Sequence, residues 1–265
     1  MKFTVLTLFP EIPRAFFENS IMAKAVDKGI IAYELVNIRD FALDKHKTCD
    51  DNPYGGGAGM LMKTEPLCRA LEKVNVKPKT VKKNGKKRNK TKRVIYVTPS
   101  GKPLTQKIAY ELSREEELVF ICGRYEGIDQ RIIDSYVDDE LSIGDYVLSS
   151  GELAATVIID SVYRLVDGVI SSESLEEESF TDGLLEYPQY TRPEVFAGMK
   201  VPEILLSGHH ENIRKWRLKK RLEKTLRNRP ELITQARNNG KLTEEAEKMI
   251  EEITNPSPLS GETGD

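Results

Sequence analysis

The stretch of this chain best suited to holding a ligand through its backbone is Ser142 to Leu153, which reads SIGDYVLSSGEL. Gly144 and Gly151 bracket a short, strand-like apolar core, and a carboxylate follows each glycine. Because glycine has no Cβ atom and tolerates positive φ, a backbone that carries it can turn sharply and come within hydrogen-bonding distance of a flat ligand. The same residues also fit a simpler interpretation, a strand that ends in a tight turn at the start of a helix.

Turn-forming residues follow apolar runs at two other places in the chain. Thr98 to Gly101 (TPSG) follows RVIYV and Gly123 to Gly127 (GRYEG) follows LVFIC, as Ser149 to Gly151 follows DYVL. In an open parallel sheet, ligands bind beyond the carboxyl ends of the strands. We therefore predict that these three loops line one pocket. None of them matches the dinucleotide-binding or phosphate-loop glycine patterns, and neither does the run Gly55 to Gly59.

The elements that position these loops alternate between strands and helices over residues 1 to 170. Apolar, β-branched runs predict strands at 2–9, 30–38, 93–98, 118–122 and 136–143, and helical spacing predicts helices at 12–28, 65–74, 104–114, 128–135 and 151–166. This order predicts an α/β domain with a largely parallel sheet and helices on both faces. The strand pattern alone favours an unknotted, doubly wound sheet, because knots are rare.

A second region begins after a polar, acidic stretch. Residues 171–183 open with SSESLEEES and are interpreted as a flexible linker. Residues 184–254 lack strand alternation, and a leucine stripe at i, i+4 and i+8 from Leu218 predicts a helix of a small helical domain. Trp216 lies off this stripe, so the start of that helix must face something other than the leucine core. Residues 255–265 are expected to be a disordered tail.

The net charge of −2 conceals two concentrated basic segments. Lys77 to Arg93 holds ten basic residues and no acidic one, so the rest of the chain carries 30 basic against 42 acidic residues. His209 to Arg229 holds nine Lys or Arg against two Glu. Concentrated positive charge on an otherwise acidic protein indicates a polyanionic partner. For Lys77 to Arg93, a solvated and disordered loop is an equally open alternative.

The remaining composition excludes several classes of protein. No apolar run approaches the roughly 20 residues that a membrane helix needs. The N-terminal MKFTVLTLF, broken by Pro-Glu, is typical of a first strand rather than of a signal peptide, so we expect a cytoplasmic protein. With only three Cys and three His, the sequence predicts neither a disulfide framework nor a structural metal site.

Six segments in order along the chain carry a resemblance to one family. They are PYGGGAGM (53–60), YVTPSG (96–101), CGRYEGID (122–129), SIGDYVLSSGELAA (142–155), SFTDGLLEYPQYTRPE (179–194) and GHHENIRKWR (208–217). Together they resemble the bacterial tRNA (guanine-37-N1) methyltransferases, which belong to the SPOUT superfamily. The resemblance implies a sheet with a deep trefoil knot, S-adenosylmethionine as the methyl donor, tRNA as the partner, and a homodimer whose active site is built at the subunit interface. It implies neither DNA nor a membrane as a partner.

The resemblance also implies a cofactor site made mostly of backbone. Its residues would be Tyr96, Thr98, Pro99, Gly123, Tyr125, Glu126, Gly127, Ile143, Gly144, Asp145, Tyr146, Val147, Leu148, Ser150 and Gly151. Backbone groups in such loops can read the adenine edge, and apolar side chains can cover its faces. Where the family usually has two glycines, this chain has Ser150-Gly151, and a side chain at position 150 could narrow the pocket.

Methyl transfer to N1 of guanine requires a base, because that nitrogen carries a proton at neutral pH. By resemblance the base is Asp182, and Arg164 is the cation that stabilises negative charge developing on O6. From the residues alone, Asp182 fits an Asp-Gly turn or a helix cap equally well, and Arg164 fits a helix-surface ion pair with Asp160 or Asp167. The family's activity uses magnesium, although no ligand cluster in the sequence indicates a site.

The basic helical region would then face the RNA. The residues assigned to phosphate contacts are Arg192, His209, Arg214, Lys215 and Arg217, while Trp216 either packs within the domain or stacks on a base. Two rival functions are considered: a SPOUT ribose 2′-O-methyltransferase, which needs no base for a ring nitrogen, and a non-enzymatic RNA-binding protein on a decayed scaffold.

Overall fold

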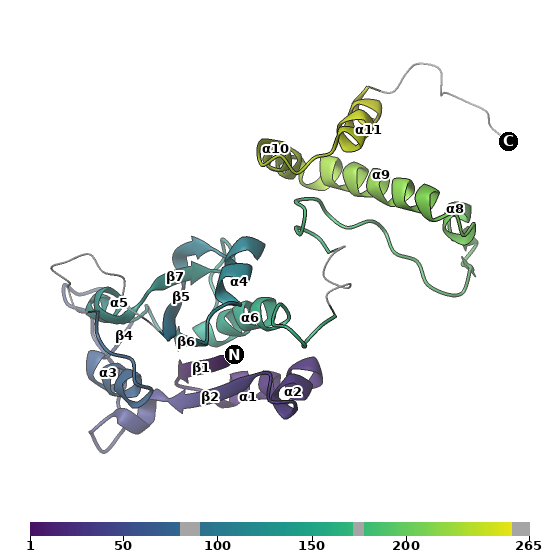
Figure 1. The fold of residues 1–265 in the computed structure, drawn as a ribbon. Coiled ribbons are helices and arrows are strands. Elements are labelled where there is room, and N and C mark those ends of the chain that lie inside the picture. The colour runs from purple at the N-terminus through teal and green to yellow at the C-terminus, as the bar shows by residue number, and fades with distance from the viewer. Residues whose placement is uncertain (80–90, 172–177, 256–265) are drawn as a thin grey trace. The chain divides into compact units, whose positions relative to one another are not determined.

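The computed structural model describes residues 1–79, 91–171 and 178–255 (Figure 1). The chain divides into two compact units, Met1–Ser171 and Ser172–Asp265, which are described separately below. Most of the basic segment Lys77 to Arg93, most of the acidic stretch that opens the expected linker, and residues 256–265 of the expected tail lie outside the described residues.

The first unit is built on a five-stranded sheet with the strand order β2-β1-β6-β5-β7. Its strands are β1 (Lys2–Thr7), β2 (Ala32–Asn37), β5 (Lys92–Pro103), β6 (Glu117–Cys122) and β7 (Asp139–Ser142). Every neighbouring pair is parallel, as the alternation of strands and helices predicts. All residues of the central strand β6 are buried, which is typical of a parallel sheet covered on both faces.

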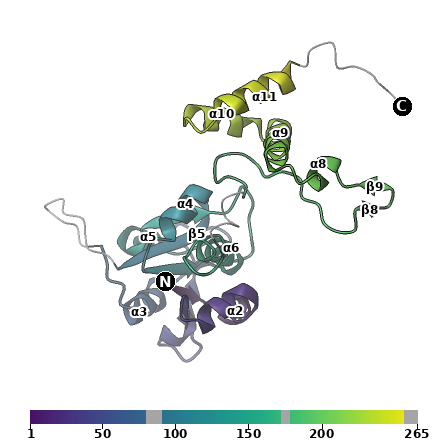
Figure 2. The same cartoon turned by 45° about the vertical axis from the view of Figure 1, so that its right-hand side comes forward.

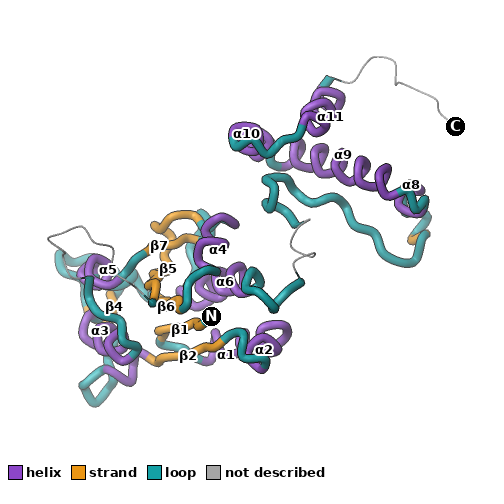
Figure 3. The backbone as a smooth tube through the Cα atoms, viewed as in Figure 1, coloured by secondary structure: helices purple, strands orange, loops and turns teal. Residues whose placement is uncertain are grey.

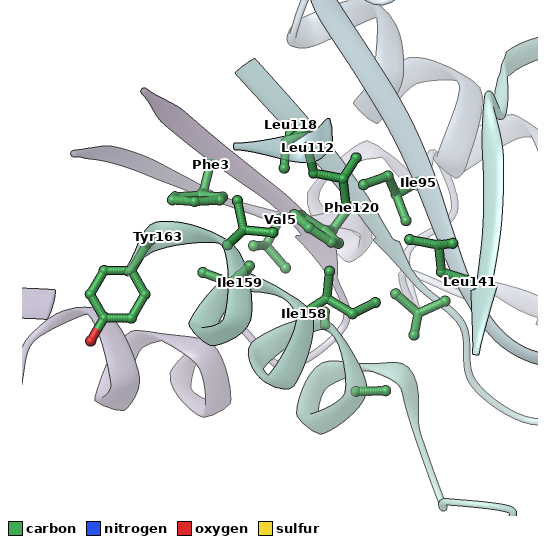
Figure 4. Packing of buried hydrophobic residues seen from close by; sticks show 14 of the residues in the cluster. Phe3, Val5, Ile95, Leu112, Leu118, Phe120, Leu141, Ile158, Ile159 and Tyr163 are labelled. Carbon is green, nitrogen blue, oxygen red and sulfur yellow. The ribbon is translucent and has the colours of Figure 1, made fainter. Parts of the chain in front are cut away.

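Helices cover the two faces of this sheet, and the pleat of the strands explains how. Phe3 and Val5 of β1 belong to one hydrophobic cluster and Leu6 belongs to another, because side chains that differ by one position point to opposite faces. The first cluster includes residues of α1 (Glu11–Phe17), α2 (Ser20–Asp27), α4 (Gln106–Leu112) and α6 (Gly151–Tyr163). The second includes residues of α3 (Thr64–Lys73) and α5 (Gln130–Tyr136). Figure 4 shows Ile158 and Ile159 of α6 against the side chains of the sheet.

The structure departs locally from the sequence predictions in the first unit. The single helix expected over 12–28 is two helices, because Asn19 is extended and caps the start of α2. The strand expected over 93–98 continues to Pro103 through a register shift between Val97 and Lys102, so the TPSG turn is an irregularity within β5. The apolar core at 146–148 is not a strand but an exposed turn. A short 3-10 helix, η1 (Ile38–Phe41), and the two-residue strands β3 (Asp50–Asp51) and β4 (Leu61–Met62) lie within the expected loop at 39–60 or just after it.

The second unit consists mainly of helices. They are α8 (Glu203–Leu206), α9 (His210–Asn228), α10 (Pro230–Asn238) and α11 (Glu244–Thr254), preceded by a long loop and the small hairpin β8 (Val195–Phe196) and β9 (Met199–Lys200) (Figures 2 and 3). The leucine stripe of α9 forms the core as predicted: Leu222 is fully buried and packs with residues of α10 and α11. Trp216 instead faces Tyr190, with ring centroids 6.4 Å apart.

Across the described residues, we find no helix that is both long enough and apolar enough to span a membrane.

Candidate active site

The irregular part of β5, the loops that follow β6 and β7 and the first residues of α6 enclose one cavity of about 200 Å³. It is lined by nearly every residue that the sequence assigned to the cofactor: Tyr96, Thr98, Pro99, Gly123, Tyr125, Glu126, Gly127, Ile143, Gly144, Tyr146, Val147, Leu148, Ser150 and Gly151. Asp145 lies in the same loop but does not line the cavity. The prediction missed Val97, Arg124, Ser142, Ser149 and Ala154, which also line it. Their signal was their position within or beside the same three loops.

Gly151 is required where α6 begins, because two backbones meet there. Its N–H donates to the carbonyl oxygen of Gly123 at 3.0 Å. A Cβ atom at position 151 would lie 2.9 Å from the nitrogen of Gly123 and 3.0 Å from Cα of Cys122. Ser150, in contrast, has extended backbone with φ of −166°, which any residue adopts. The serine at this position therefore causes no backbone strain.

The loop after β7 presents apolar side chains at the rim of the cavity. Ser142 Oγ accepts the N–H of Gly144 at 3.2 Å and donates to its carbonyl at 3.0 Å, which closes the turn. Tyr146 and Val147 are 54% and 83% exposed, although the hydroxyl of Tyr146 donates to the carbonyl of Ile143 at 3.4 Å. These side chains are placed to cover a flat ligand that occupies the cavity.

The glycine-rich run at 55–59 is fixed to the loop after β6 at its far end. The N–H of Glu126 donates to the carbonyl of Met60 at 3.0 Å, and the N–H of Met62 donates to the carbonyl of Gly127 at 3.0 Å. A Cβ atom at Gly59 would meet Cγ of Glu126 at 2.4 Å. A residue larger than glycine at position 59 would therefore press on the side chain of Glu126, which lines the cavity.

Two buried groups beside the cavity are chemically quiet. Burial, with a smaller effect of the Glu152 charge, raises the pKa of the Cys122 thiol well above its usual value, so this cysteine is not a nucleophile at neutral pH. Burial likewise raises the pKa of Tyr96, and hydrogen bonds at its hydroxyl oppose that effect in part. The cavity thus offers binding groups rather than a reactive side chain.

Arg164 caps the carboxyl end of α6, whose amino end forms part of the cavity. At 1.5 Å per residue, Arg164 lies about 20 Å along the helix from Gly151 and about 15 Å from Ala154, the last residue of α6 that lines the cavity. Asp160 lies one turn earlier in α6. Burial raises its pKa above the usual value, and the charge of Arg164 opposes this rise in part. The charge of Arg164 thus acts on Asp160, one of the two partners considered from the sequence.

Asp182 lies in the second unit and is held by Arg221 of α9. Nη1 and Nη2 of Arg221 donate to the two carboxylate oxygens at 2.7 and 2.5 Å, and the N–H of Leu184 donates to Oδ1 at 3.2 Å. Burial raises the pKa of Asp182, but the hydrogen bond and charge of Arg221 outweigh it, so the pKa lies below its usual value. Gly183 has φ of +96°, so the Asp-Gly turn considered from the sequence is present.

The two catalytic candidates belong to different units, Arg164 to the first and Asp182 to the second. Sequence reasoning missed Arg221, although its place in the basic segment His209 to Arg229 was a signal. Arg221 and Asp182 are 39 residues apart, so no sequence pattern indicated that they pair.

The residues assigned to RNA occupy the start of α9 and the loop before it. Arg214 donates to Glu211 at 2.9 Å and to Glu245 at 2.8 Å, and Lys215 lies 3.7 Å from Glu211. The guanidinium of Arg217 lies over the ring of Tyr187 at 4.6 Å. His209 and Arg192 are exposed, the first immediately before α9 and the second before a cis proline.

No group of three or more His, Cys, Asp or Glu residues that could hold a metal ion occurs among residues 1–79, 91–171 and 178–255.

The fold and the cavity define the class of protein first: an α/β protein that can hold a flat ligand among strand-end loops and that carries a basic helical unit. The chain matches the family tRNA (Guanine-1)-methyltransferase TrmD over residues 1–235 and belongs to it. The family expected from the six sequence segments is thereby confirmed, and with it an enzyme of the methyltransferase class that modifies tRNA.

Relatives of similar length support this membership. The tRNA (guanine-N(1)-)-methyltransferase of Treponema denticola is 69% identical over 96% of this chain and 100% of its own length. The protein of that name from Treponema pallidum is 60% identical over 96% of both chains. The one from Borrelia duttonii is 63% identical over 88% of this chain and 92% of its own.

Proposed function

We propose that the chain transfers a methyl group from S-adenosylmethionine to N1 of guanine 37 of tRNA, the nucleotide 3′ of the anticodon. The observation that carries this proposal is the cavity formed by β5 and the loops after β6 and β7, together with the activity for which relatives that match almost the whole chain are named. Residues 1–170 would hold the cofactor and residues 184–254 would bind tRNA, with residues 171–183 as the linker. A tRNA substrate also favours a cytoplasmic location.

The cavity fits the cofactor by its chemistry. Backbone groups of the loops after β6 and β7 suit the hydrogen-bonding edge of an adenine, and Ile143 and Leu148 supply apolar cover. When bound, the cofactor supplies a sulfonium methyl that is already electrophilic. The protein therefore has to position the guanine and remove the N1 proton.

Asp182 would accept that proton. Its side chain is 46% exposed and so within reach of a substrate, but both oxygens accept hydrogen bonds from Arg221 in this state. A carboxylate engaged in this way is a weak base, because the same contacts that lower its pKa compete with the incoming proton. Proton transfer thus requires Arg221 to move away, and an RNA phosphate is a suitable new partner for a guanidinium.

Arg164 would stabilise the charge that develops on O6 of guanine, and it would do so in the site of a second protomer. Leu153, Val157, Asp160 and Arg164 follow one another at helical spacing on α6, and the two apolar members are 56% and 47% exposed. Two copies of α6 packed in antiparallel fashion across a two-fold axis would cover these side chains and bring each Arg164 towards the cavity of the other chain. This supports the homodimer expected from the resemblance.

The trefoil knot is part of the same proposal. Its support is the close packing of consecutive loops: Gly151 donates to Gly123, and a Cβ atom at Gly101 would lie 2.6 Å from the backbone of Glu140. The phosphate contacts proposed for the second unit are those of Arg192, His209, Arg214, Lys215 and Arg217.

The activity is tested by incubating the protein with labelled S-adenosylmethionine and unmodified tRNA transcripts that carry G37 or A37, followed by nucleoside analysis. We expect 1-methylguanosine from the G37 transcript alone. Label on ribose would favour the 2′-O-methyltransferase, and failure to bind the cofactor in calorimetry would favour the non-enzymatic protein. Asp182→Asn should lower the rate of transfer by about 10² to 10⁴ and leave cofactor binding unchanged. Retained activity would refute the role of Asp182.

The shared site is tested by mixing two inactive variants, Arg164→Ala and the pocket variant Gly151→Val. If Arg164 serves the partner's cavity, a mixed dimer has one complete site, and subunit exchange should restore part of the activity. Mixtures that stay inactive despite proven exchange would place Arg164 in the site of its own chain.

A further inference from the structure

Three neighbouring strands of the sheet place an aromatic ring between two arginines. Phe9 follows β1, Arg39 lies in η1 after β2, and Arg124 lies in the loop after β6. The guanidinium carbon of Arg124 is 4.1 Å from the centroid of the Phe9 ring, and that of Arg39 is 5.8 Å from it. Because β2, β1 and β6 are adjacent and parallel, this cluster lies at the same sheet edge as the cavity, and Arg124 lines both.

The two arginines have no carboxylate partner among the described residues. Neither makes an ion pair or a side-chain hydrogen bond there, and Nε of Arg124 is buried without a partner. Two acids close to these arginines in sequence are engaged elsewhere: Asp40 pairs with Lys47 at 3.2 Å, and Asp129 pairs with Arg131 at 2.7 Å. Two positive charges beside one ring repel each other, and an anionic ligand would remove that cost.

The aromatic ring determines which ligand fits. A guanidinium that lies on a ring uses its flat face, so the N–H groups in its plane remain available to an acceptor. Those N–H groups form a fork that matches the oxygens of a phosphate. A pair of such forks held in place on one ring therefore suits phosphate groups of a nucleic-acid backbone.

We propose that Arg39 and Arg124, held on Phe9, bind backbone phosphates of the substrate RNA beside the cavity. This rests on the proposed function in taking RNA as the substrate. Arg124 reaches the cavity, whereas Arg39 lies two strands away and does not line it, so the pair marks a path for the RNA backbone that leads from the target nucleotide across the ends of β6, β1 and β2. One alternative is that Arg124 instead holds the carboxylate of the cofactor.

The test is the salt dependence of tRNA binding by the full chain, measured by fluorescence anisotropy between about 50 and 300 mM KCl. Each phosphate contact contributes about 0.7 to 0.9 to the slope of log K against log salt. We expect Arg39→Gln and Arg124→Gln each to reduce the slope by about that amount, and Arg39→Lys to retain it because the charge remains. Arg69→Gln on α3 is the matched control, since Arg69 already pairs with Glu65 at 2.8 Å and its loss should leave the slope unchanged.

Unchanged slopes for folded Arg39→Gln and Arg124→Gln proteins, checked by thermal unfolding, would overturn the proposal. So would an Arg124→Gln protein that binds S-adenosylmethionine more weakly in calorimetry but keeps the wild-type slope, because that result assigns Arg124 to the cofactor. The two proposals fail separately. Reduced slopes without methyl transfer would leave the phosphate site standing and refute the activity, and methyl transfer with unchanged slopes would do the reverse.

Discussion

Replacing Arg221 with Met separates the two effects of its pairing with Asp182: stabilising the helical unit and weakening the base. A hydrogen bond to a charged group contributes about 1.5 to 3 kcal/mol, but Asp182 is 46% exposed and solvent screens the pair. We therefore expect the pair to stabilise the protein by about 1 to 2 kcal/mol at pH 7. Met also loses the bond from Nε to the carbonyl of Leu185, so the pair is best isolated by a double-mutant cycle with Asp182→Asn.

The pH dependence identifies the ion pair as the cause. The folded pKa of Asp182 lies below its unfolded value, so the stabilisation is fully present above the unfolded pKa of about 3.9 and is lost as pH falls through the folded pKa. Arg221 of α9 is the charged group that holds Asp182, and Lys241 donates from Nζ to the carbonyl of the preceding residue, Thr181. Urea unfolding of the four proteins of the cycle should give a coupling energy that is constant from pH 7 to about pH 5 and decreases below pH 4.

The kinetic consequence is opposite in sign to the stability change. With tRNA and cofactor bound beforehand, Arg221→Met should transfer the methyl group in a single turnover at least as fast as the wild type, because the base is released. Weaker tRNA binding is expected if Arg221 moves to a phosphate. A coupling energy near zero would refute the stabilising pair, and a single-turnover rate that falls as far as that of Asp182→Asn would show that Arg221 is needed for the chemistry.

Two further substitutions, each with a control, test the packing inside each unit. Gly151→Ala should weaken S-adenosylmethionine binding about tenfold or more in calorimetry, because the new Cβ atom would press on the backbone of Cys122 and Gly123. Ser150→Gly is the control and should change the affinity little. Equal effects of the two substitutions would contradict the role of the close approach at Gly151. Leu222→Ala should destabilise the helical unit by about 2 to 5 kcal/mol in thermal unfolding, and Leu206→Ala, 54% exposed, by less than about 0.5 kcal/mol; similar costs would show that the leucine stripe is not the core.

The centre of the sheet could be predicted from the sequence because strands such as β6 are apolar on both faces. Runs such as LVFIC have no polar side to confuse with a surface helix, and β6 is buried throughout. Elements set by backbone conformation were harder. The break between α1 and α2 rests on Asn19 and on positive φ at Ser20, and no apolar period marks it. The two-residue strands at 50–51 and 195–196 are too short for any alternation to show.

The cavity could be predicted for a different reason: glycines in the sequence indicate sharp turns and close approaches of the backbone. Gly123 and Gly151 lie where two backbone segments approach closely, and both glycines can be located from the sequence alone. No comparable sign in the sequence indicated side-chain contacts between distant segments. Arg221 meets Asp182 from 39 residues away, and Phe9, Arg39 and Arg124 come together only because their strands are neighbours in the sheet order.

The distance along α6 is the reason to expect that two chains share the proposed chemistry. Arg164 lies about 20 Å along the helix from Gly151 and about 15 Å from Ala154, so we expect it not to reach a ligand in the cavity of its own chain. A second copy in antiparallel packing removes this obstacle, because it places the end of one helix beside the start of the other. The exposed Leu153 and Val157 would then be covered by the same contact that completes the site. In this arrangement, Ser142 to Leu153 of one protomer would hold the methyl donor, and the partner protomer would supply Arg164 as the cation.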